Sequence, residues 1–359
     1  MKYDITVTKP YLPELKQYVN YLERIWTSRW VTNNGVLVRE FEQKLRDYLG
    51  VPYVFFVSNG TIALQIALKA LEVQDEVITT PFSFVATSSA ILWENLIPIY
   101  ADINPENYCI NVDLIEQKIT PKTRAILATH VYGHPCDVKK IRDLADAYHL
   151  SVIYDGAHAF GANYNGKSLL SYGDISTLSF HATKLFHTIE GGAVITRNPD
   201  IAKKIELLRN FGLSNNEYID VGINAKNSEF HAAIGLSMFD AVPEIIQKRK
   251  YLSGIYSNIL SDTYLTFPKQ IQEEEYNYAY YPIFFEAENQ LVKVKNALEK
   301  ARIESRRYFF PSLNKLLFIN GSDCSLSEEA AKTALCLPLY YDLSDVDCKK
   351  VALIVKENL

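Results

Sequence analysis

The sequence predicts an α/β protein: a mostly parallel sheet covered by helices on both faces, followed by a smaller C-terminal α+β domain. Short apolar runs typical of buried strands alternate with helical patterns through the first half of the chain. At 359 residues, the chain is too long for one simple core. Polar residues follow several of the predicted strands, and ligands bind at the carboxyl ends of the strands in such folds.

Hydrophobic periodicity defines the elements of the large domain. Apolar residues at three- and four-residue steps predict a helix over 36–49, which Gly50 closes. Strands and helices then alternate. Strands are expected at 54–57, 76–80, 97–100, 125–130, 152–154, 177–181 and 193–196, and helices at 62–71, from Pro81 to 93, and at 138–149.

The remaining third differs in character, being richer in tyrosine. The elements expected after the last of these strands are a helical region at 197–250 with a polar break at 213–226, aromatic strands at 276–285, and helices at 291–301 and from 344 onward. We therefore expect a large ligand-binding domain at 1–240 and a small domain at 241–359.

Composition excludes several classes of function. The net charge of −5 indicates no basic surface for nucleic acid. The five cysteines form no CxxC pair, and neither they nor His181 and His187 match a zinc motif, so we expect no metal and a reducing compartment. The N-terminus lacks the apolar core of a signal peptide, and no apolar run could span a bilayer. These features predict a cytoplasmic protein without nucleic-acid or membrane partners.

One lysine has the setting of a covalent nucleophile. Lys184 ends the run Ser-Phe-His-Ala-Thr-Lys, and Glu-Gly-Gly-Ala follows at 190–193. An isolated lysine is usually a surface residue with its stem along apolar neighbours, but Phe180, Phe186 and the glycines argue against a solvated face. A desolvated amine loses proton affinity and attacks carbonyls, as a Schiff-base lysine does.

Two further groups follow strand ends. Asp155 ends the run Val-Ile-Tyr-Asp and precedes Gly-Ala-His; the aspartate could be a turn residue and His158 a structural histidine. Ser-Asn-Gly-Thr at 58–61 begins a helix, where free amides bind phosphate, although a plain helix cap explains it too. A lysine for the aldehyde and a carboxylate for the pyridinium nitrogen are what pyridoxal phosphate requires.

A second phosphate-loop pattern is a coincidence. Residues 161–168 match GxxxxGK[ST], which functions only between a strand and a long helix. Here Ser-Tyr-Gly-Asp at 171–174 breaks any helix, and Asn165-Gly166 predicts a hairpin turn. No GxGxxG follows a strand either, which disfavours a nicotinamide enzyme.

The assembled motifs resemble those of the DegT/DnrJ/EryC1/StrS family of sugar-nucleotide aminotransferases, over nearly the whole chain. Their order and spacing are far more specific than any one motif. The resemblance implies fold type I, similar to aspartate aminotransferase, with pyridoxal 5'-phosphate as cofactor. The matching segments include Ser-Asn-Gly-Thr at 58–61, Thr-Pro-Phe-Ser-Phe-Val-Ala-Thr at 80–87 and His-Val-Tyr-Gly at 130–133. The runs around Asp155 and Lys184 described above, at 155–158, 179–184 and 190–193, also match, as do residues 222–229 together with 232–235.

The resemblance also implies roles for matching positions. Lys184 would form the Schiff base and move protons, and Asp155 would keep the pyridinium nitrogen protonated. The residues implied around the rest of the cofactor are Gly60, Thr61 and Ser179 at the phosphate and Phe84 and His158 at the ring.

Two other segments are implied to complete the site. Asn224 and Lys226 match a segment that reaches the cofactor phosphate of the neighbouring subunit, which implies a homodimer with shared sites. Lys226 replaces a frequent arginine and so lacks the bidentate fork, and Asn227 replaces a more usual apolar residue. The residues implied at the sugar nucleotide are Arg306, Tyr308 and Phe309, since arginine suits a diphosphate.

The resemblance implies a ping-pong reaction with L-glutamate as donor. In similar family members, SFHATK followed by EGG accompanies amination at C4, whereas SFYPGK with DGG more often accompanies C3. The expected acceptor is therefore dTDP-4-dehydro-6-deoxy-D-glucose, and its 4-amino product would serve O-antigen or deoxysugar biosynthesis.

Other functions remain open at this point. A 3-aminotransferase, or one acting on UDP- or GDP-linked keto sugars, would carry similar motifs. A sugar 3-dehydratase of the same fold would carry histidine in place of Lys184. A non-catalytic regulator or binding protein on this scaffold is a further alternative, which the intact Lys184, Asp155 and Ser179 disfavour.

Overall fold

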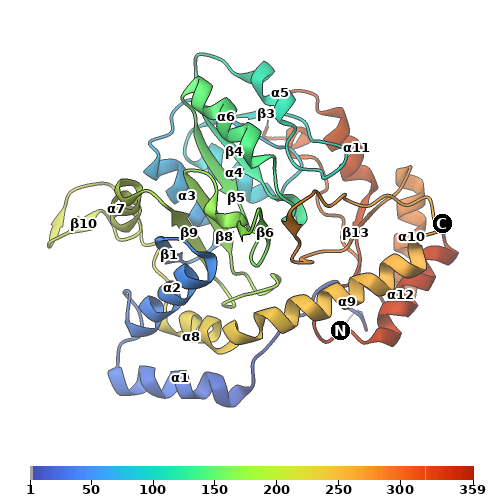
Figure 1. Ribbon diagram of the computed structural model, residues 1–359, viewed down its shortest axis with the longest axis horizontal. Helices are drawn as coiled ribbons and strands as arrows, with labels where there is room; N and C mark the ends of the chain where they lie inside the picture. Colours follow the sequence, from blue (N-terminus) through green and yellow to red (C-terminus); the bar gives the residue numbers. More distant parts are fainter. Residues whose placement is uncertain (1–2, 320) are drawn as a thin grey trace.

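The computed structural model describes residues 3–319 and 321–359. Within them lies a seven-stranded sheet of order β1-β9-β8-β5-β4-β2-β3 (Figure 1). Only β9 runs antiparallel to its neighbours β1 and β8, so the mostly parallel sheet is confirmed. The strands are β1 (Tyr53–Val57), β2 (Glu76–Thr79), β3 (Ile97–Tyr100), β4 (Thr123–Thr129), β5 (Ser151–Asp155), β8 (Ile175–Ser179) and β9 (Gly192–Thr196).

Helices cover both faces of this sheet. Alternate residues of β1 join different hydrophobic clusters: Val54 and Phe56 belong to the cluster that includes α2 and α6, and Phe55 and Val57 to the cluster that includes α3, α4 and α7. This alternation is the period of a pleated strand. The helices of this part are α1 (Leu15–Ser28), α2 (Val36–Leu49), α3 (Gly60–Ala70), α4 (Val85–Trp93), α5 (Val112–Ile115), α6 (Val138–Tyr148), α7 (Pro199–Leu208) and α8 (Glu229–Met238).

A separate hydrophobic cluster forms the core of the C-terminal part. It includes Leu252, Val294 and Val351 from three helices, and Ile5 from the N-terminal segment joins it. The long helix α9 runs from beside α8 toward this part (Figure 1). A domain boundary near residue 240 stays a prediction. The elements here are α9 (Val242–Leu260), α10 (Glu288–Lys300), α11 (Ser325–Thr333), α12 (Asp345–Glu357), β13 (Pro282–Phe284) and β14 (Ala334–Cys336).

Several local expectations are confirmed. The turn at Asn165-Gly166 joins β6 (Asn163–Tyr164) to β7 (Lys167–Ser168), as a hairpin rather than a phosphate loop. The polar break in the helical region forms a second hairpin, of β10 (Leu213–Ser214) and β11 (Glu217–Tyr218).

All five cysteines are buried free thiols. No helix of the described chain is both long and apolar enough to cross a membrane.

The aromatic strand expected over 276–285 is wrong for most of its length. Only β13 is a strand there, and β12 (Glu274–Glu275) pairs with β6 just before it. The intervening backbone bends through a left-handed Tyr278, with φ of 54°. Side chains distant in sequence hold this segment, which a pattern of aromatic residues does not reveal.

A buried ion pair covers the open edge of the sheet at β1. Glu42 Oε1 accepts a hydrogen bond from the Phe56 amide at 2.8 Å and lies 2.5 Å from Arg209 Nη1. Arg209 also donates to the Phe56 carbonyl, and both side chains are at most 8% exposed. The pair therefore satisfies the outward backbone groups of an edge strand that would otherwise lack partners.

Replacing Arg209 tests the importance of this pair. Arg209→Met leaves the Glu42 carboxylate buried without its cation, so the free energy of unfolding should fall by about 3–5 kcal/mol in urea titrations. Among the described residues, the exposed Arg197 bonds only to the Gly50 carbonyl, so Arg197→Met should change stability by less than about 0.5 kcal/mol. Equal losses in the two variants would contradict the assigned role.

Candidate active site

The carboxyl edge of the sheet opens into a cavity of about 330 Å³. Gly60 follows β1, Asp155 ends β5 and Ser179 ends β8, so these strands bring distant residues together. The C-terminal part closes the opposite side. The sequence-predicted residues that line this cavity are Gly60, Thr61, Phe84, Asp155, His158, Ser179, Lys184, Arg306, Tyr308 and Phe309.

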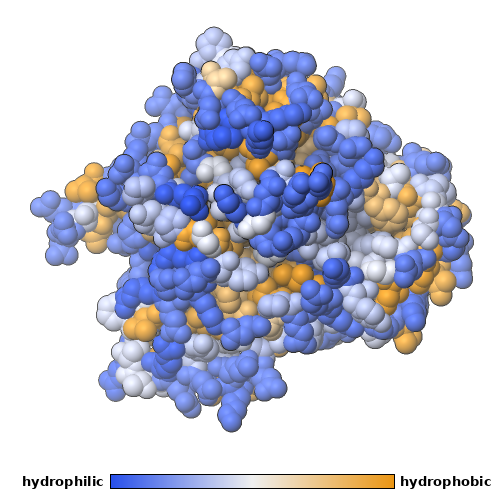
Figure 2. Space-filling model, in the orientation of Figure 1, coloured by the Kyte–Doolittle hydropathy of each residue, from blue (hydrophilic) through white to orange (hydrophobic). Residues whose placement is uncertain are grey.

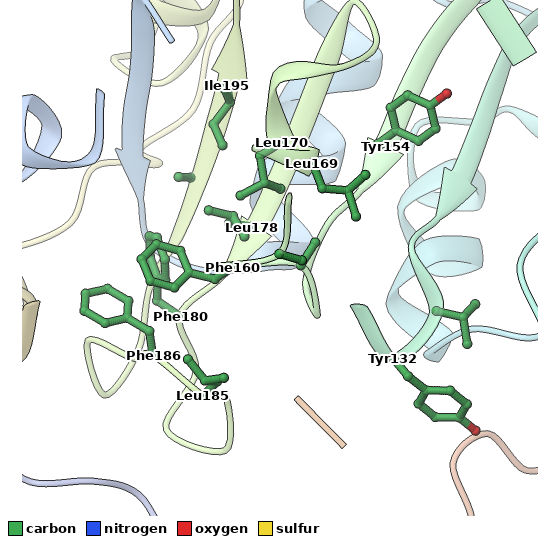
Figure 3. Close-up of a cluster of buried hydrophobic side chains, with 14 of the residues drawn as sticks. Tyr132, Tyr154, Phe160, Leu169, Leu170, Leu178, Phe180, Leu185, Phe186 and Ile195 are labelled. Atoms are coloured by element: carbon green, nitrogen blue, oxygen red, sulfur yellow. The ribbon is translucent and has the colours of Figure 1, made fainter. Parts of the chain in front are cut away.

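Lys184 lies in the loop between β8 and β9. The loop closes through hydrogen bonds from the Phe180 amide to the Gly191 carbonyl at 2.8 Å, and from the Thr188 amide back to Phe180. Phe180, Leu185 and Phe186 point into the cluster below it, where the Phe160 and Phe186 rings stack at 4.5 Å (Figure 3). This anchoring holds Lys184 at the cavity and excludes a freely solvated surface lysine.

The amine of Lys184 is poorly solvated. Its Nζ lies 3.4 Å from Tyr280 Oη, and desolvation lowers the pKa of the ammonium, against the opposing influence of Tyr308 and Asp155. A lowered pKa increases the fraction of neutral amine, which is the form that attacks a carbonyl or accepts a proton.

Asp155 is a buried carboxylate held in one orientation. Its Oδ1 accepts from the Ala157 amide at 3.1 Å and its Oδ2 from Thr87 Oγ1 at 2.9 Å. Burial nevertheless raises the pKa of Asp155, although these hydrogen bonds and Lys184 favour the charged form. A cationic ring nitrogen facing Asp155 would offset this desolvation, so the residue fits a pyridinium partner.

Sequence reasoning assigned no role to Thr87. Its hydroxyl, besides contacting Asp155, lies 2.8 Å from Ser83 Oγ, which in turn lies 3.0 Å from Thr129 Oγ1. This buried hydroxyl chain orients the carboxylate from behind. Thr87 ends one of the matching motifs, but nothing in the sequence pairs it with a residue on β5.

The start of α3 lines a recess of the cavity. Asn59 caps the helix by accepting from the Ile62 amide at 2.9 Å, so the cap interpretation is correct. The first amides, of Gly60 and Thr61, have no intrahelical acceptor and border the cavity. A Cβ on Gly60 would lie 2.9 Å from Ser179 Cβ, so glycine lets the helix start reach the end of β8. The recess therefore suits a phosphate as well.

An aromatic wall borders the other side of the cavity. The His158 ring lies parallel to Phe309 with centroids 5.6 Å apart, and Nδ1 accepts from the Tyr132 amide at 3.2 Å. That bond places the proton of the neutral imidazole on Nε2, and burial lowers the pKa of His158 well below its usual value. Phe84 is largely exposed and free to cover a bound ring.

Arg306 provides a cation beside the cavity. Its Nη1 donates to Tyr308 Oη at 2.7 Å, and its Nη2 lies 3.2 Å from Glu304 Oε1. The side chain keeps 42% exposure, so an incoming anion can reach it. The adjacent Arg307 pairs with Glu288 instead and does not line the cavity.

Asn224 and Lys226 do not line this cavity. Lys226 Nζ donates to Asn210 Oδ1 at 2.9 Å and lies over the Phe211 ring. The unusual Asn227 has a structural explanation: its Nδ2 donates to the Val57 carbonyl at 3.3 Å and to that of Glu190 at 3.0 Å, joining β1 to the end of the lysine loop. Their roles toward a second subunit stay predictions.

Gly60→Ala tests the recess. The added methyl would push Ser179 away, so the affinity for pyridoxal phosphate should fall by about tenfold or more, measured by equilibrium titration of cofactor absorbance. Gly254 lies on α9 with nothing near its Cβ position, so Gly254→Ala is the matched control and should leave affinity unchanged. An unaltered affinity in Gly60→Ala would show that the cofactor phosphate does not bind in this recess.

Comparison with known proteins agrees with this geometry. A model of the DegT/DnrJ/EryC1/StrS aminotransferase family matches residues 14–356. A dTDP-4-amino-4,6-dideoxy-D-glucose transaminase of Escherichia coli is 41% identical, with 95% of each chain covered. A GDP-perosamine synthase of Escherichia coli O157:H7 is 35% identical, with 87% of this chain and 86% of the relative covered.

The solved structures show the same relationship. The crystal structure of DesI in the presence of its TDP-sugar product superposes with a TM-score of 0.94 at 31% identity, covering 98% of this chain and 92% of DesI. The family, the fold and the lysine–aspartate cavity thus agree. The chain belongs to the DegT/DnrJ/EryC1/StrS aminotransferase family and is a sugar aminotransferase that depends on pyridoxal phosphate.

Proposed function

We propose that this enzyme transfers the amino group of L-glutamate to C4 of dTDP-4-dehydro-6-deoxy-D-glucose, giving dTDP-4-amino-4,6-dideoxy-D-glucose and 2-oxoglutarate. The observation that carries the chemistry is the meeting of Lys184 and Asp155 at one cavity, between the free amides of α3 and the cation of Arg306. The acceptor is supported by the 41% identity to the Escherichia coli transaminase. The buried free thiols of this enzyme suit the reducing cytoplasm.

The side chains of the cavity divide the work of amino transfer. Bound pyridoxal phosphate supplies an electron sink and carries the amino group between the two substrates. Asp155 would hold the proton on the ring nitrogen, and the α3 amides with Ser179 would hold the phosphate. Lys184 removes the α-proton of glutamate and, in the second half-reaction, delivers a proton to C4 of the sugar.

Arg306 and the aromatic wall are proposed to bind the sugar nucleotide. The guanidinium offers a fork of donors to a diphosphate, and Tyr308 orients it through their hydrogen bond. The GDP-perosamine synthase relative makes a GDP-linked acceptor the second candidate. Amination at C3 is the remaining alternative within the family.

We also propose that two copies of the chain share their active sites. The β10–β11 hairpin projects from the body (Figure 1), and Tyr218 at its end is exposed, as are Ile219 and Val221 just after it. Figure 2 shows hydrophobic surface on this projection. Lys226, which follows the hairpin, does not line the cavity of its own chain and bonds to Asn210 instead. A second copy seated on this surface would cover the apolar residues and receive the charge of Lys226 at its cofactor phosphate.

Product analysis tests the proposed reaction. Purified enzyme with pyridoxal phosphate, L-glutamate and the dTDP-linked 4-keto sugar should yield a C4 amine identified by NMR, and Lys184→Ala provides the blank. An amine at C3 would instead show that the enzyme is a 3-aminotransferase. If the enzyme still converts its cofactor with glutamate but yields no amino sugar, the proposed acceptor is wrong. The GDP-linked keto sugar would then be tested next.

Subunit mixing tests the shared sites. Lys184→Ala and Lys226→Ala should each be nearly inactive alone, yet their mixed dimer would contain one complete site. After random subunit exchange, about a quarter of wild-type activity should return, because half of the dimers are mixed and half of their sites are intact. A mixture no more active than its components would place Lys226 outside the neighbour's site.

A further inference from the structure

We propose that Tyr280 is a catalytic residue of the amino transfer, whose phenol holds the Lys184 amine in place while that amine is not bonded to the cofactor. The inference rests on the aminotransferase chemistry and not on which sugar is the acceptor. Its basis is a contact that no motif indicated: Lys184 Nζ lies 3.4 Å from Tyr280 Oη at the cavity.

The Tyr280 ring is fixed by its neighbours. Its centroid lies 4.8 Å from that of His158, 5.6 Å from that of Tyr308 and 5.8 Å from that of Tyr132, in edge or tilted geometries. The hydroxyl is therefore held toward the lysine. A phenylalanine would keep these ring contacts and lose only the oxygen.

A buried clamp holds the backbone on which Tyr280 lies. Asn277 Nδ2 donates to the carbonyls of His158 at 2.7 Å and Phe160 at 2.9 Å, both on the segment after β5. Arg249 of α9 donates to the carbonyls of Tyr278 at 2.9 Å and Ala279 at 2.6 Å. These bonds attach residues 277–279 to the segment after β5, more than a hundred residues earlier, and to α9, about thirty residues earlier.

The clamp is costly for a purely structural link. Arg249 is only 6% exposed, and in the described part of the chain its buried charge is hydrogen-bonded to two backbone carbonyls and to no carboxylate. Tyr276 Oη adds a hydrogen bond of 3.2 Å to the Tyr280 carbonyl. Such support is what a side chain that must be placed accurately against Lys184 requires.

The surrounding charges decide what the phenol does. Asp155, His158 and Tyr308 also face Lys184; His158 is neutral because burial lowers its pKa, and Tyr308 Oη already accepts from Arg306. Burial raises the pKa of Tyr280, so its phenol stays neutral and accepts a hydrogen bond from the protonated amine. The phenol thus favours the ammonium form, which Lys184 takes when it carries a proton between substrate carbons.

Tyr280→Phe tests this directly. Full-length enzyme is loaded with pyridoxamine phosphate, which leaves Lys184 as a free amine without any sugar or glutamate. The pKa of Lys184 is then measured from the pH dependence of its trace acetylation, followed by mass spectrometry of the peptide. Loss of the phenol oxygen should lower that pKa by about one unit, since one hydrogen bond to a charged group is removed.

The neighbouring tyrosine provides the matched control. Tyr281 Oη lies 3.0 Å from Ser257 Oγ in the C-terminal cluster, away from the cavity, so Tyr281→Phe should leave the Lys184 pKa unchanged. The glutamate half-reaction of Tyr280→Phe should slow by about tenfold or more, with KM for glutamate nearly unchanged. A Lys184 pKa in Tyr280→Phe that equals the control, or rises, overturns the proposal whatever the acceptor sugar is.

Discussion

The site depends on one electrostatic arrangement: a buried carboxylate and a desolvated amine that face the same cavity from neighbouring strand ends. Neither charge is well solvated, since burial raises the pKa of Asp155 and lowers that of Lys184. Their mutual attraction offsets only part of this cost. A cofactor with a cationic ring nitrogen and an aldehyde supplies the missing partners, so the cavity is complementary to it before any substrate arrives.

Two kinds of support keep these charges in place. Behind Asp155, the hydroxyls of Thr87, Ser83 and Thr129 form a buried polar chain, which orients the carboxylate. Beneath Lys184, the support is apolar, because Phe180 and Phe186 anchor the loop in the core. Polar support suits a group that must stay charged, whereas apolar support limits the water that would stabilise the ammonium form.

The sequence indicated the residues at the sheet edge, and the family resemblance indicated Arg306, Tyr308 and Phe309 on the C-terminal wall, but neither indicated Tyr280. Asn59, Asp155 and Lys184 were found because each follows a short apolar strand, and parallel strands bring their carboxyl ends together. Tyr280 was missed because its position depends on bonds between segments that are distant in sequence. Asn277 bonds to a segment more than a hundred residues before it, and Arg249 bonds to the Tyr278 carbonyl about thirty residues after it. Periodicity reports local burial and carries no information on such contacts.

The residues around the cavity come from two parts of the chain, the sheet edge and the C-terminal part. The residues proposed to hold the cofactor lie at the carboxyl edge of the sheet, whereas Tyr280, Arg306 and Tyr308 come from the C-terminal part across the cavity. The Tyr280–Lys184 contact joins the two sides at the reacting amine itself. In the proposed mechanism, a sugar nucleotide bound against Arg306 and Tyr308 would therefore contact the same wall from which Tyr280 reaches Lys184. This proposal couples substrate recognition to proton transfer through the packed rings of Tyr308 and Tyr280 rather than through the strands of the sheet.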